Sequence, residues 1–307
     1  MKVVGLITEY NPFHNGHKYH IEEARRITGA DYVIAVMSGN YVQRGAPAII
    51  DKFSRARMAL LNGVDLVLEL PVCFATASAE YFAHGAISLL DKLGVVDCIC
   101  FGSECGDINL LNKAADLLLA GTRICDEHLQ ACLKEGKSYP AARTAAIQKV
   151  MDVETVSDKE LIGQILNEPN NILGIEYIKA IRRLNSDIKP ITIKRISAHY
   201  HDRKLADASA AYTGEGYTAT ADIIKTVSSA TAIRAAILDG NRPLAPDAII
   251  SFDRLKSSLP ANVYGILMEN FLKTFPITEE DFAQLLFYRL IYEDRNSITE
   301  YMDVSED

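Results

Sequence analysis

Apolar runs and amphipathic stretches alternate regularly over the first hundred residues. The apolar runs are Val3–Thr8, Tyr32–Met37, Leu66–Leu70 and Cys98–Phe101, and the stretches with helical spacing between them are Gly16–Ile27, Lys52–Asn62 and Ala77–Leu93. A run such as 33–36 is apolar on both faces, which is typical of a strand in a parallel sheet that helices cover on both sides. The pattern therefore predicts an α/β fold with a Rossmann-like, doubly wound parallel sheet.

The rest of the chain has mainly helical spacing. Leucine-rich and alanine-rich runs predict a helical insertion over about residues 107–165. A helix over Asn171–Leu184 then leads into a strand over Ile191–Ile196 that returns to the sheet. A further helix is expected to open near Ser228, and residues 247–307 have a mostly helical pattern. We expect one domain over residues 1–240 and a helical C-terminal region over residues 241–307.

Composition narrows the class of protein. With 49% hydrophobic residues, the chain of 307 residues can fill a substantial core, and it has no apolar stretch near the roughly 18 residues of a membrane span. The N-terminus carries no recognisable export signal, so we expect a cytoplasmic protein with no membrane partner. The six cysteines lack the paired spacing of a zinc site and are expected to be reduced core thiols with no disulfide partner.

The net charge of −8 argues against indiscriminate binding to nucleic acid, which depends on Lys and Arg side chains that neutralise phosphates. One local basic stretch, Arg182–Lys204, also contains His199, Tyr200 and His201. Such a stretch is more often a solvated face than an RNA contact. Charge alone leaves both interpretations open.

Chemistry is expected in the loops that follow the strands, because open α/β sheets bind ligands at the carboxyl ends of their strands. Four such loops are Glu9–Gly16, Ser38–Gly45, Pro71–Thr76 and Gly102–Asp107. The first of them has the most specific pattern, TEYNPFHNGH over residues 8–17, and joins a strand to the start of a helix.

A helix N-terminus offers unpaired N–H groups and a positive dipole end to phosphates, and Gly16 lets a nucleotide approach bare backbone. His14 and His17 can donate N–H bonds to phosphate oxygens, and can become cationic near neutral pH as charge builds on a leaving pyrophosphate. Two other interpretations remain. One is a metal site formed with His20, which lacks an acidic or Cys partner, and the other is simple capping.

A second motif, SSATAIR, covers residues 228–234. Its hydroxyl and N–H groups, including those of Ser229 and Thr231, suit the β- and γ-phosphates, with Arg234 as a charge-assisted clamp. The same pattern is typical of an ordinary capped helix start. Together with HNGH at residues 14–17, it resembles the pair of signatures of the HxGH adenylyltransferase superfamily, which includes the class I aminoacyl-tRNA synthetases.

Several further segments resemble one family. They are Gly5–His17, Met37–Gly45, Asp65–Pro71, Phe101–Glu104, Pro169–Gly174 and Lys194–Ile196. These segments span most of the chain and are similar to those of the bacterial tRNA(Met) cytidine acetate ligases. The resemblance implies an enzyme that activates acetate with ATP, forms acetyl-adenylate and then acetylates N4 of the wobble cytidine of elongator tRNA(Met). Mg²⁺ is expected as the counter-ion of ATP, held mostly by phosphates and water, with no set of protein metal ligands.

Carried over residue by residue, the resemblance implies an ATP-binding loop and three further nucleotide contacts. The loop residues are Ile7, Thr8, Glu9, Tyr10, Asn11, Pro12, Phe13, His14, Asn15, Gly16, His17, Lys18, Tyr19 and His20, and the further contacts are Gly102, Asn170 and Arg195. Gly102 allows close approach, Asn170 has donor and acceptor groups, and Arg195 can neutralise a phosphate or a carboxylate. A turn glycine, a helix N-cap and a surface cation are the ordinary alternatives.

Other expectations are less specific. The loop Ser38–Gly45 could close over acetate or the acyl-adenylate, and Arg44, Arg55 and Arg57 could each contact an anion. Family members generally continue past the position of Asp307 through a further helical, basic region, so we expect this chain to retain ATP binding and to lack part of a tRNA-binding surface.

Two competing functions fit the superfamily motif. The first is a transferase that moves AMP onto a phosphorylated small molecule, such as a pantetheine or a nicotinate nucleotide precursor. The second is a non-catalytic module that binds a nucleotide or RNA, against which the intact His14, His17 and Arg234 argue.

Overall fold

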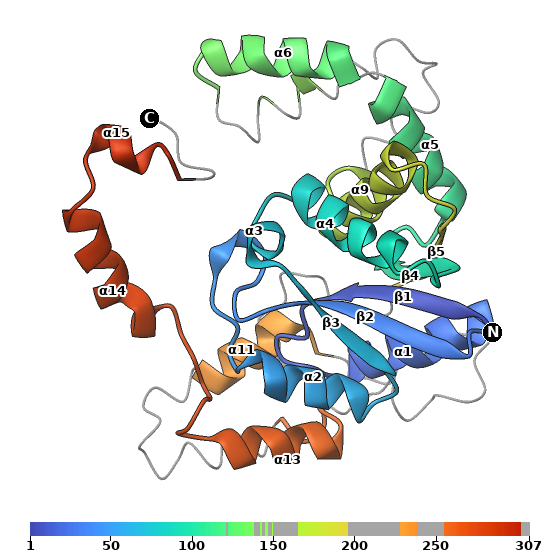
Figure 1. Ribbon diagram of the computed structural model, residues 1–307, viewed down its shortest axis with the longest axis vertical. Helices are drawn as coiled ribbons and strands as arrows, with labels where there is room; N and C mark the ends of the chain where they lie inside the picture. The colour runs from blue at the N-terminus through green and yellow to red at the C-terminus, as the bar shows by residue number, and fades with distance from the viewer. Residues whose placement is uncertain are drawn as a thin grey trace. The chain divides into compact units, whose positions relative to one another are not determined.

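The computed structural model describes residues 1–120, 122–137, 142, 145–146, 149, 165–195, 228–238 and 255–301. Five strands of this part of the chain form one sheet in the order β3-β2-β1-β4-β5 (Figure 1). The strands are β1 (Val3–Thr8), β2 (Tyr32–Ser38), β3 (Leu66–Leu70), β4 (Cys98–Ser103) and β5 (Lys189–Lys194). They pair in parallel, which confirms the predicted doubly wound α/β fold. Strand β5 lies two residues earlier than the predicted strand Ile191–Ile196.

Helices occupy most of the segments between the strands. They are α1 (Asn15–Thr28), α2 (Lys52–Leu60), α3 (Val72–Ala75), α4 (Ala79–Lys92), α5 (Ile108–Ala120), α6 (Thr122–Lys134), α9 (Pro169–Arg183), α11 (Ala230–Leu238), α13 (Ala261–Asn270), α14 (Glu280–Ile291) and α15 (Arg295–Ile298), with a 3-10 helix η1 (Gln43–Gly45). The predicted helices around α1, α2, α4 and α9 are confirmed to within a few residues. Helices α5 and α6 confirm the helical start of the predicted insertion, and its residues 150–164 lie outside the described part.

The strand order reverses between β1 and β4: β2 and β3 follow on one side of β1, and β5 follows β4 on the other. In open parallel sheets, ligands bind beyond the carboxyl ends of the strands at such a reversal. The loop after β1 carries the HNGH motif, and the loop after β4 begins with Glu104. Two of the four loops expected to carry chemistry therefore follow the two strands at the reversal.

By its internal contacts the chain divides into two compact units, each of which is described by itself. Unit 1 consists of Met1–Leu6, Glu23–Val33 and Ala79–Arg195, and unit 2 consists of Ile7–Glu22, Ile34–Ser78 and Ile196–Asp307. The predicted domain boundary near residue 240 falls in a segment outside the described residues, so that division stays a prediction.

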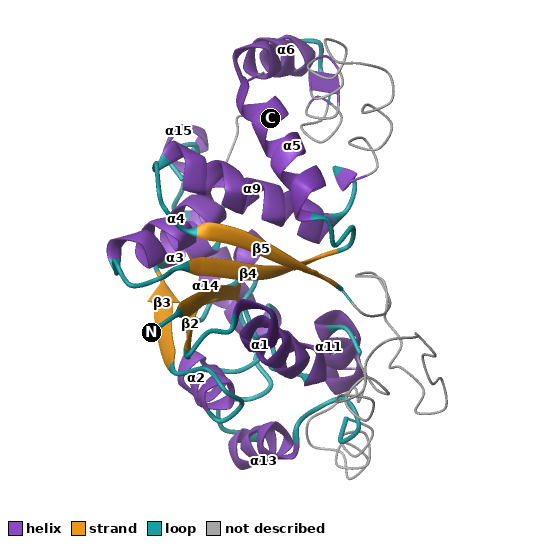
Figure 2. Cartoon of the chain, turned by 90° about the vertical axis from the view of Figure 1, so that its right-hand side faces the viewer, coloured by secondary structure: helices purple, strands orange, loops and turns teal. Residues whose placement is uncertain are grey.

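In unit 1, helix α9 packs on the sheet and on two neighbouring helices. It packs against α4, α5 and strand β4, as Figure 2 shows. All of its residues from Gly174 to Ile181 are buried, including an internal ion pair between Glu176 and Lys179 with Nζ and Oε2 2.8 Å apart. The helix approaches the sheet closely at Gly174, where an added Cβ would lie within 3.2 Å of three ring atoms of Phe101.

This close approach predicts that Gly174→Ala destabilises the chain, although alanine is the better helix former. The methyl group forces a shift of Phe101 or of α9, and overpacking of this kind costs about 1–3 kcal/mol. Gly265→Ala in α13 is the matched control, because a Cβ there meets nothing within 4 Å and should stabilise by about 0.5–1 kcal/mol. Urea unfolding measures both changes. Equal stabilisation by the two substitutions would contradict the packing.

In unit 2, strand β2 pairs with β3 in register from Ile34 with Leu66 to Ser38 with Leu70. Helix α2 packs against β3 and α13. The helix α14 contrasts with these, because none of its residues is buried (Figure 1). Its exposed apolar side chains are Leu285, Leu286, Phe287, Tyr288, Leu290 and Ile291. Helices α13, α14 and α15 confirm the helical pattern predicted towards the C-terminus.

The cysteines with a described environment are free thiols. Cys98, Cys100 and Cys132 are buried, and burial raises the pKa of Cys100 to about 12, which makes this thiol unreactive. Cys73 is exposed on the short helix α3, so the expectation of a core thiol is wrong at this position. Within the described ranges, no helix is long and apolar enough to cross a membrane.

Candidate functional site

The HNGH loop lies between β1 and α1 and is tied to its surroundings at both ends. Tyr10 and Phe13 are almost completely buried, and the side-chain oxygen of Asn11 accepts a hydrogen bond from the backbone N–H of Ile49 at 2.8 Å. At the start of α1, the Asn15 backbone N–H and side-chain amide donate to the carbonyls of Ser258 and Ser257. The loop is therefore held by two distant parts of unit 2.

The two motif histidines stack on each other. Their ring centroids are 3.7 Å apart with an interplanar angle of 27°, and His14 is only 8% exposed. Nδ1 of His14 accepts from the Gly16 backbone N–H at 3.1 Å, and Nδ1 of His17 accepts from the His14 backbone N–H at 3.3 Å. In a neutral imidazole one nitrogen accepts and the other donates, so both rings carry their proton on Nε2.

This arrangement gives the loop two Nε2–H donors of fixed orientation, which is the chemistry expected of a phosphate contact. The expectation that the rings become cationic stays a prediction.

The SSATAIR motif contacts the HNGH loop directly, through Arg234. Arg234 Nη1 donates to the Asn11 carbonyl at 2.8 Å, and Nη2 lies 3.3 Å from the Thr231 hydroxyl. The Ser229 hydroxyl accepts from the Ala232 backbone N–H at 3.0 Å, which is helix capping at the start of α11. The structure thus confirms the capping interpretation for Ser229, and it shows that Arg234 anchors the backbone of the first loop.

A separate polar cluster in unit 1 contains the other three predicted residues. Asn170 Nδ2 donates to Glu104 Oε1 at 2.5 Å, and Asn170 Oδ1 accepts from Arg195 Nη1 at 3.1 Å. The stem of Arg195 passes over Gly102, where an added Cβ would lie 3.1 Å from Arg195 Cγ. Gly102, Asn170 and Arg195 are therefore neighbours, as a shared site requires.

The N-cap alternative for Asn170 is wrong. The cap position of α9 is Glu168, without a capping side chain, and Asn170 is the second residue of the helix. The free N–H groups at this helix end are met instead by Glu104, whose Oε2 accepts from the Asn171 backbone N–H at 2.9 Å. In the opposite direction, Asn171 Oδ1 accepts hydrogen bonds from the backbone N–H groups of Glu104 and Cys105.

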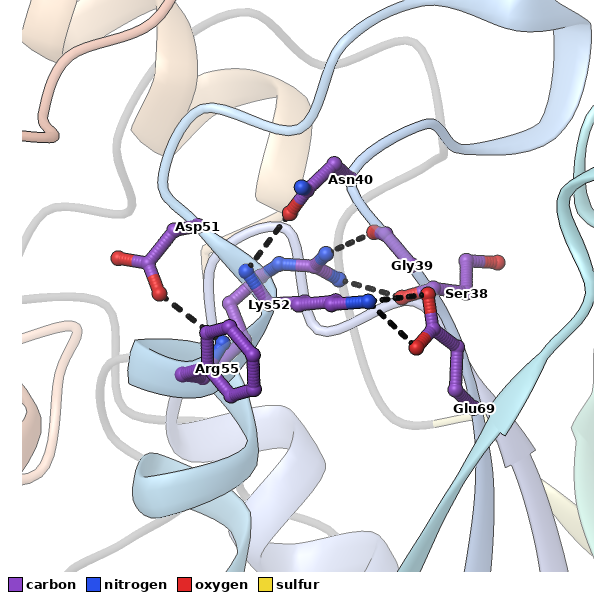
Figure 3. Close-up of polar contacts among 8 residues, drawn as sticks. Ser38, Gly39, Asn40, Asp51, Lys52, Arg55 and Glu69 are labelled. Carbon is purple, nitrogen blue, oxygen red and sulfur yellow. Dashed lines mark hydrogen bonds and ion pairs between the residues drawn. The ribbon is translucent and has the colours of Figure 1, made fainter.

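Among the described residues, Arg55 is the largest side chain that is fully buried. Figure 3 shows its contacts. Its guanidinium donates to four carbonyl oxygens in three segments, those of Glu9 at 2.6 Å, Ser38 at 3.0 Å, Ile50 at 3.1 Å and Gly39. Burial lowers the pKa of Arg55 to about 10, against the opposing effect of the carboxylates of Glu9, Asp51 and Glu69, so the group is cationic at neutral pH.

The expectation that Arg55 contacts an anionic ligand is therefore wrong, because the side chain is fully buried and four of its five N–H donors bind backbone carbonyls. Arg57, for which the same was expected, is paired on the surface with Glu269 at 3.0 Å. The side chain of Arg44 lies outside the described parts. Sequence inspection missed the role of Arg55 because the carbonyls it joins lie up to 46 residues away.

The loop Ser38–Gly45 is anchored at several points. The Gln43 backbone N–H donates to Glu9 Oε1 at 2.8 Å, and Asn40 Oδ1 accepts from the Lys52 backbone N–H at 3.0 Å. Lys52 Nζ in turn forms an ion pair with Glu69 at 2.6 Å (Figure 3). These contacts hold the loop against the HNGH segment, and closure of the loop over a ligand stays untested.

Three buried hydroxyl groups near the carboxyl ends of β1 and β2 have no hydrogen-bond partner among the described residues. They belong to Thr8, Tyr10 and Ser38. Burial raises the pKa of the Tyr10 hydroxyl far above its usual range, with a smaller lowering by the nearby Thr8 side chain, so Tyr10 stays protonated. Buried polar groups normally have partners, so these hydroxyls are exceptions among the described residues.

The predicted basic stretch is less available than its sequence indicates. Arg182 Nη1 pairs with Asp116 at 2.7 Å, and Arg183 pairs with Glu80. Lys189 and Lys194 are exposed, whereas residues 196–204 lie outside the described part. In the parts of the chain that are described, no group of three His, Cys, Asp or Glu side chains could hold a metal ion.

Comparison with known proteins places this geometry in a family. The model of the HIGH Nucleotidyl Transferase family matches residues 1–213 and 212–307. A protein of Acetivibrio thermocellus named tRNA(Met) cytidine acetate ligase is 45% identical over 283 residues, which cover 92% of this chain and 61% of that protein. A protein of the same name from Clostridium kluyveri is 42% identical over 307 residues, with 100% and 68% coverage.

Solved structures agree with these matches. The apo crystal structure of Thermotoga maritima TmcAL aligns with a TM-score of 0.79 at 38% identity, covering 96% of this chain and 63% of that one. A second form of the same protein, bound with alpha-thio ATP, aligns with a TM-score of 0.77. The chain spans between about half and two thirds of the length of the curated relatives it first matches.

Proposed function

Because this chain belongs to the HIGH nucleotidyltransferase family, among the tRNA(Met) cytidine acetate ligases, we propose that it activates acetate with ATP and acetylates tRNA. The acceptor is N4 of the wobble cytidine of elongator tRNA(Met). Such a reaction takes place in the cytoplasm, where ATP and tRNA meet. The whole activity is a proposal, because the chain matches only part of the length of its relatives.

One observation carries the proposal: Arg234 fastens the second motif to the Asn11 carbonyl beside the two stacked histidines. Two motifs more than two hundred residues apart are thereby joined at the N-terminus of α1. The polar side chains brought together there are the imidazoles of His14 and His17 and the guanidinium of Arg234. Donors of this kind stabilise negative charge that develops on a departing phosphate group.

The proposed chemistry has two steps. A carboxylate oxygen of acetate attacks the α-phosphorus of ATP, the bond to the bridging oxygen breaks, and pyrophosphate leaves with the negative charge that His14 and His17 would stabilise. The cytidine N4 amine then attacks the acetyl carbon, AMP leaves and the amine loses a proton. The protein contributes position and charge stabilisation, and Mg²⁺ on the phosphates supplies further positive charge.

The cluster of Gly102, Asn170 and Arg195 is proposed as a further part of the nucleotide site, with Arg195 as its charged member. Arg195 is exposed, and the only contact of its guanidinium to a described residue is the bond to Asn170 Oδ1. A guanidinium has five N–H donors, so it can still bind a phosphate or a ribose oxygen. The exposed Lys194 beside it is a candidate contact for the tRNA backbone.

The proposal predicts that the chain exchanges labelled pyrophosphate into ATP only when acetate is present. Reactions with butyrate instead of acetate, and with no carboxylate, are the matched controls. Addition of unmodified tRNA(Met) should then yield N4-acetylcytidine, detected by mass spectrometry of the digested tRNA. Exchange driven by a pantetheine phosphate or a nicotinate nucleotide, and not by acetate, would instead support an adenylyltransferase of small molecules.

A further inference from the structure

The carboxylate of Glu104 sits at the centre of the cluster in unit 1. It accepts from the Asn170 side-chain amide at 2.5 Å and from the Asn171 backbone N–H at 2.9 Å, and a longer contact of 3.4 Å reaches the Asn170 backbone N–H. A carboxylate at the N-terminus of a helix is stabilised by the unpaired N–H groups and the helix dipole. Glu104 is thus held firmly on α9.

The chemistry of the two neighbours fixes which way the Asn170 amide points. Ionised Glu104 can only accept, so it must face the amide nitrogen, and Arg195 can only donate, so it must face the amide oxygen. Both requirements agree with the observed bonds at 2.5 and 3.1 Å. The orientation of Asn170 therefore follows from the charge of Glu104.

Arg195 depends on that orientation. Among the described residues, its guanidinium is fastened only by Asn170 Oδ1, while its stem rests on Gly102 and its backbone N–H donates to the Ser103 carbonyl at 2.9 Å. A reversed amide would present an N–H group to the guanidinium, and two donors cannot bond. The exposed end of Arg195 would then lose its fixed position.

We propose that Glu104 is a positioning residue, which sets the Asn170 amide and through it holds Arg195 ready for the nucleotide. The inference rests on the proposed function in one respect, the assignment of Arg195 to the ATP site. Glu104 itself touches no ligand in this arrangement, because its oxygens are occupied by Asn170 and Asn171.

The proposal predicts that Glu104→Gln weakens ATP binding about tenfold, with little change in the turnover of bound substrate. In this variant the glutamine oxygen keeps the bond to the Asn171 N–H, so the glutamine NH₂ group faces the Asn170 amide and turns it over. Direct titration of ATP measures the dissociation constant without any need for turnover. A KM for ATP that rises while kcat is kept, in the exchange assay, is the second readout.

The double variant Glu104→Gln with Asn170→Asp restores the alternation of donors and acceptors. The introduced glutamine then donates to the introduced carboxylate, which also accepts from Arg195, so ATP should bind more tightly than to the Glu104→Gln variant, although the change at Asn170, itself in the proposed site, keeps the affinity below the native value. Loss of a helix cap alone cannot produce this recovery. The matched control is Asp107→Asn, which removes a carboxylate that accepts from the N–H groups of Asn109 and Leu110 at the start of α5.

The outcomes distinguish the positioning role of Glu104 from the proposed ligase function. Weakened ATP binding in Glu104→Gln, recovery in the double variant and native affinity in Asp107→Asn support the positioning role, whether or not acetate drives exchange. Native affinity in Glu104→Gln, or a double variant as weak as the single one, overturns it. A native chain that binds ATP but shows no acetate-dependent exchange contradicts only the ligase function, and one that binds no ATP contradicts both.

Discussion

Replacing His17 with alanine should lower the rate of acetate-dependent pyrophosphate exchange by about 10²–10³-fold, the typical effect of removing one preorganised donor to developing charge. The structure gives His17 two separable roles. Its Nδ1 accepts from the His14 backbone N–H at 3.3 Å and so shapes the loop, and its Nε2–H is the donor proposed for chemistry. The substitution removes both.

Two further substitutions assign the loss to one role. Asparagine at position 17 places an amide oxygen near the place of Nδ1 and keeps the loop contact, but it lacks a donor at the place of Nε2. Glutamine reaches the place of Nε2 and lacks the loop contact. If charge stabilisation is the main role, His17→Asn is as slow as His17→Ala, and His17→Gln keeps part of the rate. An active His17→Asn and an inactive His17→Gln would make His17 a structural residue of the loop.

Replacing Arg55 with methionine should destabilise unit 2 by about 3–5 kcal/mol, because four buried carbonyl oxygens lose a charged donor. Arg55→Lys should recover little of this, since one ammonium group cannot span acceptors on Glu9, Ser38, Gly39 and Ile50. Urea unfolding monitored by circular dichroism measures the loss.

The neighbouring Arg57 provides the control for Arg55. Its ion pair with Glu269 is exposed on both sides, with 58% and 60% of the side-chain surface accessible, so Arg57→Lys should change stability by no more than about 0.5 kcal/mol. Similar losses for Arg55→Lys and Arg57→Lys would show that the buried contacts of Arg55 contribute little.

The pattern of apolar positions was sufficient to predict the fold and the order of its first elements. Strands β1 to β4 each combine a short apolar run with flanking turn residues, and this local signal predicts a buried parallel strand. The HNGH loop was predictable for the same reason, because its residues are contiguous and its chemistry is local.

Residues that act across long sequence separations were not predictable. Arg55 looks like any helical arginine until Glu9 and Ser38 are seen beside it, and nothing near Glu104 in sequence indicates that it meets Asn170, 66 residues away. The exposure of the apolar helix α14 was also hidden, since its composition is that of a core helix. Tertiary contacts decide these three cases, and local patterns do not encode them.

The carboxylate that Glu104 places on the end of α9 also affects which ions can bind at this helix end. A vacant helix N-terminus attracts sulfate and inorganic phosphate, whereas this one already carries an internal anion on the Asn171 N–H. These ions are therefore not expected to bind at the end of α9. Inhibition by phosphate or sulfate would thus point to a site other than this helix end.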